Sequence, residues 1–138
     1  TQEGGGAQKR NVNTIIMADE SCFSPEDARR LLEMNAADVL NIKLMKCGGI
    51  YKALQIIEIA EEFGVECMLG CMVESKISLT AAAHLAAAKK TITRVDLDAA
   101  ILLKEDPVVG GFNKDIPWFS LDDSPGLGIT DVIGMTDI

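Results

Sequence analysis

Lys43 is the residue whose surroundings could best support proton-transfer chemistry. It lies in the segment Asn41-Ile42-Lys43-Leu44-Met45, whose aliphatic character favours a β-strand. Side chains alternate along a strand, so Asn41, Lys43 and Met45 are expected to share one face. A parallel sheet covered by helices buries both faces, and burial lowers the pKa of a lysine toward that of a usable base. The alternative is an edge strand with Lys43 in solvent.

Charged residues also follow the neighbouring apolar segments. Asp19 and Glu20 come at the end of the run TIIMAD at 14–19. A carboxylate at the C-terminal end of a strand can hold a hard cation such as Mg²⁺, which prefers oxygen ligands. Alternatively, these residues only start a loop or cap a helix. Lys46, just before the glycine pair Gly48-Gly49, is expected to be an ordinary loop lysine.

Two further acidic positions follow later apolar segments. Asp96 and Asp98 are spaced two apart after Arg94, so on a strand all three side chains share a face. Two carboxylates could bind a cationic group such as a substrate ammonium. The alternative is a solvated strand end on which Arg94 pairs with one aspartate. Glu74 follows Met72-Val73. It is expected either to contact the site residues without touching the substrate or to cap the next helix.

Alternating strands and helices must position these side chains. Apolar, β-branched runs predict strands at 14–19, 39–45, 65–72 and 92–97. Ser24 can cap a helix whose first residue is Pro25 and whose first turn is acidic. A second helix is predicted at 51–63, where Gly64 ends it, and an alanine-rich third at 77–88. The order β-α-β-α-β-α-β predicts an α/β fold with parallel strands that all end at one rim.

Three regions follow from this pattern. Residues 1–13 are polar and glycine-rich and are expected to be a linker or an added segment. Residues 14–99 hold the four strands and three helices. Residues 100–138 are expected to form an irregular tail that packs on the preceding region or on a capping region. In this tail Trp118 and Phe119 are predicted to fill a hydrophobic gap.

Composition excludes several classes of protein. The 138 residues carry a formal net charge of −8, which argues against a nucleic-acid partner because phosphate binding needs a basic face. The sequence shows no signal peptide and no apolar run long enough to cross a membrane. The four cysteines form no C-x-x-C pair and are expected to be reduced, as is usual in the cytoplasm.

Four motifs together carry a resemblance to a known family. They are Ala18-Asp19-Glu20-Ser21, Asn41-Ile42-Lys43-Leu44-Met45-Lys46 with Gly48-Gly49, Gly70-Cys71-Met72-Val73-Glu74-Ser75, and Asp96-Leu97-Asp98. The set resembles the muconate-lactonizing-enzyme subgroup of the enolase superfamily, and the D-x-D pair makes it most similar to the L-Ala-D/L-Glu (dipeptide) epimerases. The resemblance implies the last four βα units of an eight-stranded (β/α)8 barrel of the TIM type.

The resemblance also implies an activity, a cofactor and residue roles. These enzymes remove the proton next to a substrate carboxylate and stabilise the resulting charge on Mg²⁺. Asp19 matches the third of three metal-ligand carboxylates, and Lys43 matches the acid/base lysine on one face of the substrate. Asp96 and Asp98 match the pair that binds the ammonium of a dipeptide. The remaining implied positions line the substrate pocket or support the site: Met72, Val73, Glu20 and Glu74.

Departures from the family pattern bear on activity. No K-x-K motif precedes Asp19, and the first two metal-ligand carboxylates are missing. The chain alone is therefore expected to be inactive and to need a missing N-terminal half or another copy of itself. Two alternatives stay open. The substrate could be another carboxylate, as for a muconate cycloisomerase or an o-succinylbenzoate synthase, or the chain could be a non-catalytic α/β assembly module with unpaired strand edges.

Overall fold

The central element is a sheet of four parallel strands. The computed structural model describes residues 12–115 and 117–134, so residues 1–11 of the expected linker lie outside the described part. The strands are β1 (Met17–Ala18), β2 (Val39–Ile42), β3 (Glu66–Leu69) and β4 (Ile92–Val95), and they follow one another in the sheet in sequence order. All three pairings are parallel, which confirms the predicted α/β fold.

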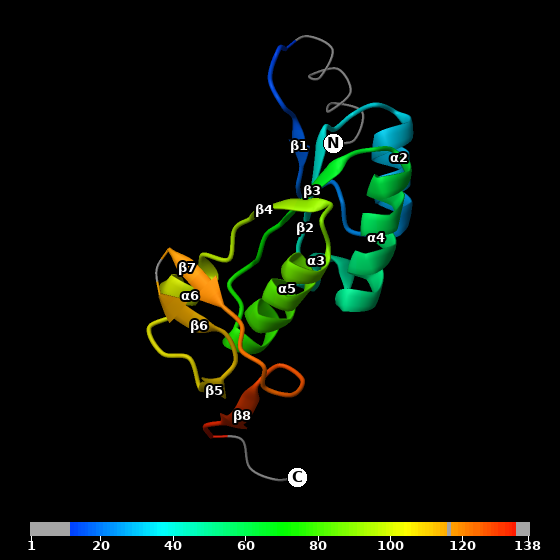
Figure 1. Cartoon of the computed structure of the whole chain (residues 1–138). Coiled ribbons are helices and arrows are strands. Elements are labelled where there is room, and N and C mark those ends of the chain that lie inside the picture. The colour runs from blue at the N-terminus through cyan, green and yellow to red at the C-terminus, as the bar shows by residue number, and fades with distance from the viewer. Residues whose placement is uncertain (1–11, 116, 135–138) are drawn as a thin grey trace.

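Three main helices connect the strands. They are α2 (Pro25–Glu33), α4 (Ile50–Glu62) and α5 (Lys76–Ala88). Ser24 caps α2 as predicted, because its hydroxyl accepts a hydrogen bond from the Asp27 N–H at 3.1 Å. Gly64 follows α4 in the left-handed conformation, with φ 65°, which suits a residue without Cβ. In Figure 1, α2 and α4 lie side by side, and α5 lies nearer the C-terminal elements.

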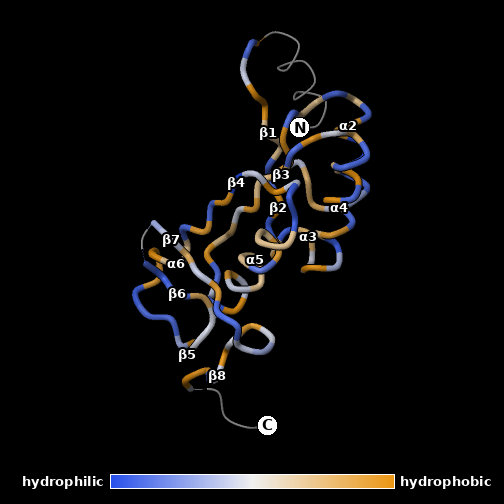
Figure 2. Tube along the Cα trace, viewed as in Figure 1, coloured by the Kyte–Doolittle hydropathy of each residue, from blue (hydrophilic) through white to orange (hydrophobic). Residues whose placement is uncertain are grey.

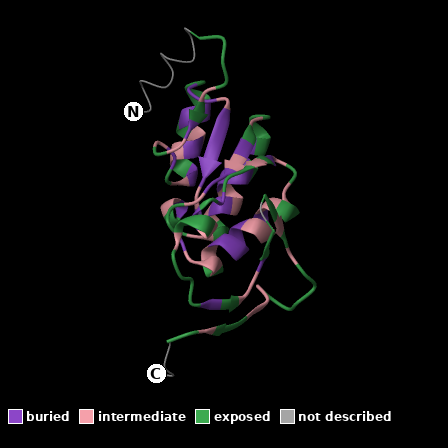
Figure 3. Cartoon of the chain, turned by 90° about the vertical axis from the view of Figure 1, so that its left-hand side faces the viewer, coloured by how far each residue is buried: buried purple, intermediate pink, exposed green. Residues whose placement is uncertain are grey.

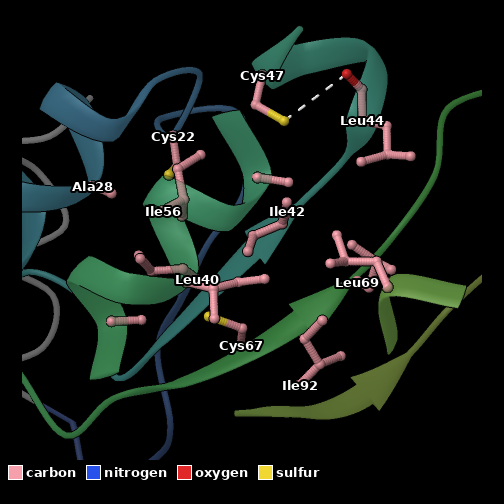
Figure 4. Close-up of a cluster of buried hydrophobic side chains, with 14 of the residues drawn as sticks. Cys22, Ala28, Leu40, Ile42, Leu44, Cys47, Ile56, Cys67, Leu69 and Ile92 are labelled. Atoms are coloured by element: carbon pink, nitrogen blue, oxygen red, sulfur yellow. Dashed lines mark hydrogen bonds between the residues drawn. The ribbon is translucent and has the colours of Figure 1, made fainter. Parts of the chain in front are cut away.

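The core fills the space between the sheet and the helices. Figure 4 shows Leu40 and Ile42 of β2 grouped with Ile56 of α4 and with Cys67 and Leu69 of β3. All five side chains are buried, and burying one such aliphatic side chain contributes about 1.5–3 kcal/mol. Figure 2 shows polar and apolar residues alternating along α2 and α4, as expected for helices with one face on a core.

The alternation of side chains along the strands places the charged residues of the predicted site on the face of the sheet that points away from the helices. Because Leu40 and Ile42 face the helices, Asn41 must face away from them. Ala18 pairs with Leu40 in the register of β1 and β2, so Asp19, the next residue, also follows on the far face. The helices and the charged residues therefore lie on opposite sides of the sheet.

The strands are shorter than the apolar runs that predicted them. Only Met17–Ala18 of 14–19 pairs as a strand, and β2 ends at Ile42 because Leu44–Cys47 forms a short helix, α3. Met45 is 63% exposed on this helix, so the prediction that it shares a strand face with Lys43 is wrong. β4 ends at Val95, and Asp96 and Asp98 therefore follow the strand rather than lie on it.

The tail is more ordered than the sequence indicated. A short helix, α6 (Ala99–Leu102), precedes two antiparallel pairs: β5 (Val108–Gly110) with β8 (Ile129–Val132), and β6 (Asn113–Asp115) with β7 (Trp118–Ser120). The segments between these elements are irregular. Figure 3 shows buried residues concentrated in the sheet and main helices, with most of the tail exposed or intermediate.

Phe112 and Asp106 fasten the tail to α5. Phe112 is buried, packs against Phe119 in a tilted arrangement with ring centroids 4.8 Å apart, and donates its N–H to the Thr80 hydroxyl at 3.2 Å. The Asp106 carboxylate accepts from the N–H of Lys76, the first residue of α5, at 2.7 Å. Trp118 is 74% exposed, so the prediction that it fills a hydrophobic gap is wrong, whereas Phe119 does pack on the core.

Two other expectations concern the cysteines and the membrane. All four cysteines are free thiols, and Cys67 is fully buried. Burial raises the pKa of the Cys67 thiol to about 12, so it is an unreactive core group. Within residues 12–115 and 117–134, the helices are too short or too polar to cross a membrane.

Candidate active site

An amine and two carboxylates meet where β1 and β2 end. Lys43 directly follows β2, and its Nζ lies 2.9 Å from Asp19 Oδ2 and 3.1 Å from Glu20 Oε1. Asp19 and Glu20 directly follow β1, the neighbouring parallel strand. The C-terminal ends of parallel strands lie at the same end of the sheet. This is the end at which α/β barrels and open α/β sheets place their catalytic and binding residues. The structure thus brings these three predicted site residues together.

The charge state of Lys43 differs from the prediction. Its side chain is 12% exposed, and this burial lowers its pKa, but the hydrogen bonds and charges of Asp19 and Glu20 outweigh burial and raise the pKa above its ordinary value. The expected lowering is therefore wrong for the amine in its present pairing. A paired ammonium is a proton donor, and it becomes a base only when its partners withdraw.

Lys46 is not the ordinary loop lysine that the sequence indicated. Its side chain is only 4% exposed. Its Nζ donates to Asp19 Oδ1 at 2.6 Å, to the Asp19 main-chain oxygen at 2.6 Å and to the Asn41 main-chain oxygen at 3.2 Å. No local signal in the sequence points to this position, because it depends on the short helix Leu44–Cys47, which begins after the extended residue Lys43.

Two ammonium groups keep the Asp19 carboxylate charged. Partial burial raises the pKa of Asp19, but the hydrogen bonds from Lys46 and Lys43 lower it further than burial raises it, so the net pKa lies below its usual range. Each carboxylate oxygen faces a different lysine: Oδ1 faces Lys46 and Oδ2 faces Lys43. Asp19 is the common partner of the whole cluster.

Asn41 and Gly70 lie next to each other beside this cluster. Asn41 is buried on the same side of β2 as Lys43, and its Oδ1 has no hydrogen-bond partner among the described residues. Gly70 makes room for this side chain, since a Cβ there would lie 2.6 Å from Asn41 Oδ1. The sequence indicated the shared face of Asn41 and Lys43 but assigned no role to Gly70.

Glu74 organises the loop after β3. It is buried, accepts a hydrogen bond from the Met72 N–H at 2.7 Å, and also accepts from the Ser78 hydroxyl. Ser75, not Glu74, occupies the N-cap position of α5. Met72 and Val73 are both exposed. A buried carboxylate thus fixes the main chain of a loop that presents two apolar side chains to the surroundings.

Asp96 and Asp98 follow β4, so they lie at the C-terminal ends of the strands, as the lysine–carboxylate cluster does. The cluster lies at β1 and β2, whereas β4 is the outer strand on the other side of the sheet. Asp96 and Asp98 are both exposed. Arg94 pairs with Glu66 at 2.6 Å, so the alternative in which it pairs with one of these aspartates is wrong. The Cys71 thiol lies 3.6 Å from Asp98 Oδ1, which brings the loops after β3 and β4 together.

The described residues do not by themselves fit a magnesium ion. Among residues 12–115 and 117–134, no three His, Cys, Asp or Glu side chains are grouped to hold a metal. Asp19 supplies one carboxylate, and ammonium groups occupy both its oxygens. Mg²⁺ needs several well-placed oxygens. The arrangement can hold a proton-carrying amine beside a charged carboxylate, and any metal would need ligands from outside these residues.

Comparison with known proteins gives consistent matches. Residues 4–131 match the model of the family described as "Enolase C-terminal domain-like". The chain is 60% identical over 119 residues to the L-Ala-D/L-Glu epimerase of Clostridium acetobutylicum, which covers 86% of this chain and 33% of that protein. It therefore spans about a third of the length of this relative.

Solved structures agree with the sequence matches. The substrate-liganded L-Ala-D/L-Glu epimerase from Bacillus subtilis superposes with a TM-score of 0.92 at 46% identity, covering 95% of this chain and 36% of that one. The Enterococcus faecalis V583 dipeptide epimerase, in complex with Mg and the dipeptide L-Leu-L-Tyr, gives 0.89 at 53% identity, covering 94% and 37%. The four βα units correspond to the C-terminal part of enolase-superfamily barrel enzymes, and the chain belongs to the enolase C-terminal domain-like family.

Proposed function

We propose that this chain forms the C-terminal part of a Mg²⁺-dependent dipeptide epimerase of the L-Ala-D/L-Glu type. One observation carries the proposal: Lys43 Nζ lies 2.9 Å from Asp19 Oδ2, at adjoining strand ends, in a chain that is 60% identical to such an epimerase. Epimerisation requires a group that removes or returns the proton on the α-carbon, and a lysine amine at the sheet edge is suited to this.

In this proposal Lys43 transfers the proton on one face of the substrate. Only a little of its side chain reaches solvent, so a substrate at the C-terminal ends of the strands would reach the amine only by displacing one of its partners. Glu20 is exposed, unlike Lys43, so this partner can move away when a substrate carboxylate arrives. General acid–base catalysis of this kind contributes about 10²–10⁴-fold to rate. The group that serves the opposite face would come from outside the described residues.

The cofactor and the substrate contacts belong to the same proposal. Asp19 would be one ligand of Mg²⁺, which supplies stabilisation of the negative charge that develops when the α-proton leaves. The similar Enterococcus enzyme, whose structure was solved in complex with Mg and a dipeptide, supports this choice. Asp96 and Asp98, both exposed at the same sheet edge, would bind the dipeptide ammonium. The exposed Met72 and Val73 would line the substrate pocket.

An exchange experiment tests the role of Lys43. The natural full-length protein that carries this sequence is incubated with Mg²⁺ in D₂O, separately with L-Ala-L-Glu and L-Ala-D-Glu. Nuclear magnetic resonance then follows deuterium uptake at the α-carbon of the Glu residue. The wild type should exchange both substrates and interconvert them. Lys43→Ala should lose exchange with one epimer by about 10²-fold or more and retain it with the other.

A matched lysine controls for loss of charge. Lys104 is 94% exposed in its side chain and lies 4.0 Å from the Glu105 carboxylate, which is also exposed, so Lys104→Ala should exchange both epimers like the wild type. Near-normal epimerisation by Lys43→Ala would remove Lys43 from the mechanism. Absence of exchange in the wild type with any dipeptide tested would refute the proposed function itself.

The two aspartates after β4 test the substrate class. If they bind an ammonium, Asp96→Asn with Asp98→Asn should lower kcat/KM for L-Ala-L-Glu by about 10–100-fold, since a hydrogen bond to a charged group contributes about 1.5–3 kcal/mol. An anionic substrate would have no need of this pair. Unchanged kcat/KM in the double variant would therefore point to another carboxylate substrate of the superfamily.

A further inference from the structure

We propose that the Cys71 thiol is a positioning residue that orients the Asp98 carboxylate for the ammonium group of the substrate. This inference rests on the proposed function, because it concerns a carboxylate to which that function assigns the dipeptide ammonium. No role was predicted for Cys71 from the sequence. Three observations carry the inference: the contact between the thiol and the carboxylate, the hydrogen bonds that fix the thiol, and the absence of charge on the thiol.

The thiol is the group that holds the Asp98 side chain. Cys71 Sγ lies 3.6 Å from Asp98 Oδ1, so its S–H can donate a weak hydrogen bond to this oxygen. Asp98 occupies the N-cap position of α6, but its side chain caps none of the helix N–H groups. Within residues 12–115 and 117–134, the thiol is the only hydrogen-bond partner of this carboxylate. The other oxygen, Oδ2, therefore remains available to a ligand.

Hydrogen bonds on both sides of Cys71 fix its position. The N–H of Gly70 donates to the Ile42 carbonyl at 2.8 Å, which continues the pairing of β3 with β2. The N–H of Met72 donates to the buried Glu74 carboxylate at 2.7 Å. Cys71 is thus held between two anchored neighbours. The thiol is the fixed partner of the contact, and the exposed carboxylate after β4 is the partner that it orients.

The thiol can direct the carboxylate without neutralising it. Burial is the largest cause that raises the pKa of the Cys71 thiol above its ordinary value; a hydrogen bond from the Ala99 main chain lowers this pKa, but the Asp98 carboxylate adds to the rise. The group is therefore an uncharged S–H at neutral pH. Asp19 differs, because ammonium groups face both its oxygens. An uncharged donor leaves the negative charge of Asp98 to the substrate.

An oriented carboxylate binds an ammonium at a lower cost in entropy. A side chain that rotates freely must lose this freedom when it binds, and fixing it beforehand reduces the loss. The benefit belongs to binding and not to proton transfer, because the ammonium of L-Ala-L-Glu is on the first residue and the exchanging proton is on the second. Loss of the thiol should therefore raise KM and leave kcat unchanged.

A double-mutant cycle tests whether Cys71 acts through Asp98. The natural full-length protein that carries this sequence is assayed with Mg²⁺ and L-Ala-L-Glu as the wild type, Cys71→Ala, Asp98→Ala and the double variant. Cys71→Ala should raise KM by about 3–10-fold, the range expected for one hydrogen bond. In the Asp98→Ala background the same substitution should change KM by less than about twofold. Effects that multiply in the double variant would overturn the inference.

A spectroscopic measurement tests the contact without turnover. The difference between the infrared spectra of the wild type and Cys71→Ala isolates the S–H stretching band of this one thiol. A hydrogen bond to a carboxylate lowers the frequency of that band. The same difference measured in the Asp98→Ala background should therefore lie at higher frequency, whereas in the Asp96→Ala background it should not move. An unshifted band in Asp98→Ala would show that the thiol does not donate to Asp98, and would overturn the inference.

Two further cysteine substitutions separate orientation from general destabilisation. Cys67→Ala removes a fully buried thiol from β3, within the core, and should lower the free energy of unfolding without raising KM. Cys71→Ser keeps a donor at the same position, so its KM should lie closer to that of the wild type than the KM of Cys71→Ala does. Equal KM values for Cys71→Ser and Cys71→Ala would contradict a role as hydrogen-bond donor, as would an equal rise in KM in Cys67→Ala.

Failure of the proposed function gives a different result. If the wild-type protein epimerises L-Ala-L-Glu but Cys71→Ala keeps the wild-type KM, only the positioning role is refuted. If the wild type exchanges no proton of any dipeptide tested, both proposals are refuted together.

Discussion

Replacing Asp19 with Asn should destabilise the fold more than removing a surface carboxylate. Asp19→Asn keeps the shape of the side chain but removes the charge that both lysines face, Lys43 at 2.9 Å and Lys46 at 2.6 Å. Lys46 is then left with its two main-chain acceptors and without the anionic partner that it now has. An ammonium that is only 4% exposed cannot recover that interaction from water.

The expected magnitude follows from burial. Breaking one side of a fully buried ion pair costs about 3–5 kcal/mol. Asp19 is 30% exposed and Lys46 retains neutral acceptors, so we expect about 2–3 kcal/mol. The control is Glu62→Gln, which breaks the Arg29–Glu62 pair of similar length, 2.8 Å, whose side chains are 43% and 55% exposed. Such a surface pair contributes at most about 1 kcal/mol.

The difference should depend on pH. The folded-state pKa of Asp19 lies below its ordinary value of 3.8, so its stabilisation is present above that value and is lost as pH falls through the lower folded pKa. The folded pKa of Lys43 lies above its ordinary value of 10.5, so its stabilisation is present below that value and is lost as pH rises further. Between these limits the destabilisation by Asp19→Asn should be constant.

Equilibrium urea unfolding, followed by far-ultraviolet circular dichroism, measures both variants at neutral pH and in acid. Asp19→Asn should lower the free energy of unfolding by at least about twice as much as Glu62→Gln, and the loss should shrink in acid. An equal effect of the two substitutions at neutral pH would show that Asp19 does not hold the lysine cluster together, and would contradict the arrangement of the three side chains.

Two further outcomes can be checked. Gly70→Ala would place a Cβ 2.6 Å from Asn41 Oδ1 and should lower the free energy of unfolding by about 1–3 kcal/mol. Adding Asn41→Ala should relieve this loss. If the losses of the two single variants simply add in the double variant, the Cβ does not clash with Asn41. Residues 1–138 alone, with Mg²⁺ and L-Ala-L-Glu, should form no L-Ala-D-Glu, because the described residues group too few metal ligands; clear turnover by chromatography would refute this. Light scattering of that sample tests self-association through the outer strands β1 and β4, and a stable monomer would disfavour the assembly-module alternative.

The order of the elements was predictable because it rests on local signals. Ser24, Pro25 and the acids after them specify the start of a helix, and the structure begins α2 at Pro25. Short apolar runs between helices indicated parallel strands, and four are present. Lys43 was selected because an amine among aliphatic residues is costly unless it is paired, and its pairing with Asp19 fits that reasoning.

The unpredicted features depend on contacts between distant residues or on ambiguous runs. Leu44 and Met45 suit a strand or a helix equally in so short a run, so α3 and the return of Lys46 were missed. The direction of the Lys43 pKa depends on partners more than twenty residues away in the sequence. The pairing of Val108 with Val132 joins strands through a long connection, and no local pattern in the tail specifies it.

Asp106 makes the tail necessary for the helix that precedes it. Its two carboxylate oxygens bridge the Lys76 N–H at 2.7 Å and the Val108 N–H at 3.0 Å, so a residue far along the chain satisfies the first turn of α5, for which Ser75 provides no side-chain cap. A protein shortened before this position would lose the carboxylate that accepts from the Lys76 N–H and the Phe112 side chain that is buried in the core. Trimming the last quarter of the sequence should therefore unravel α5 from its N-terminus and not simply remove a surface appendage.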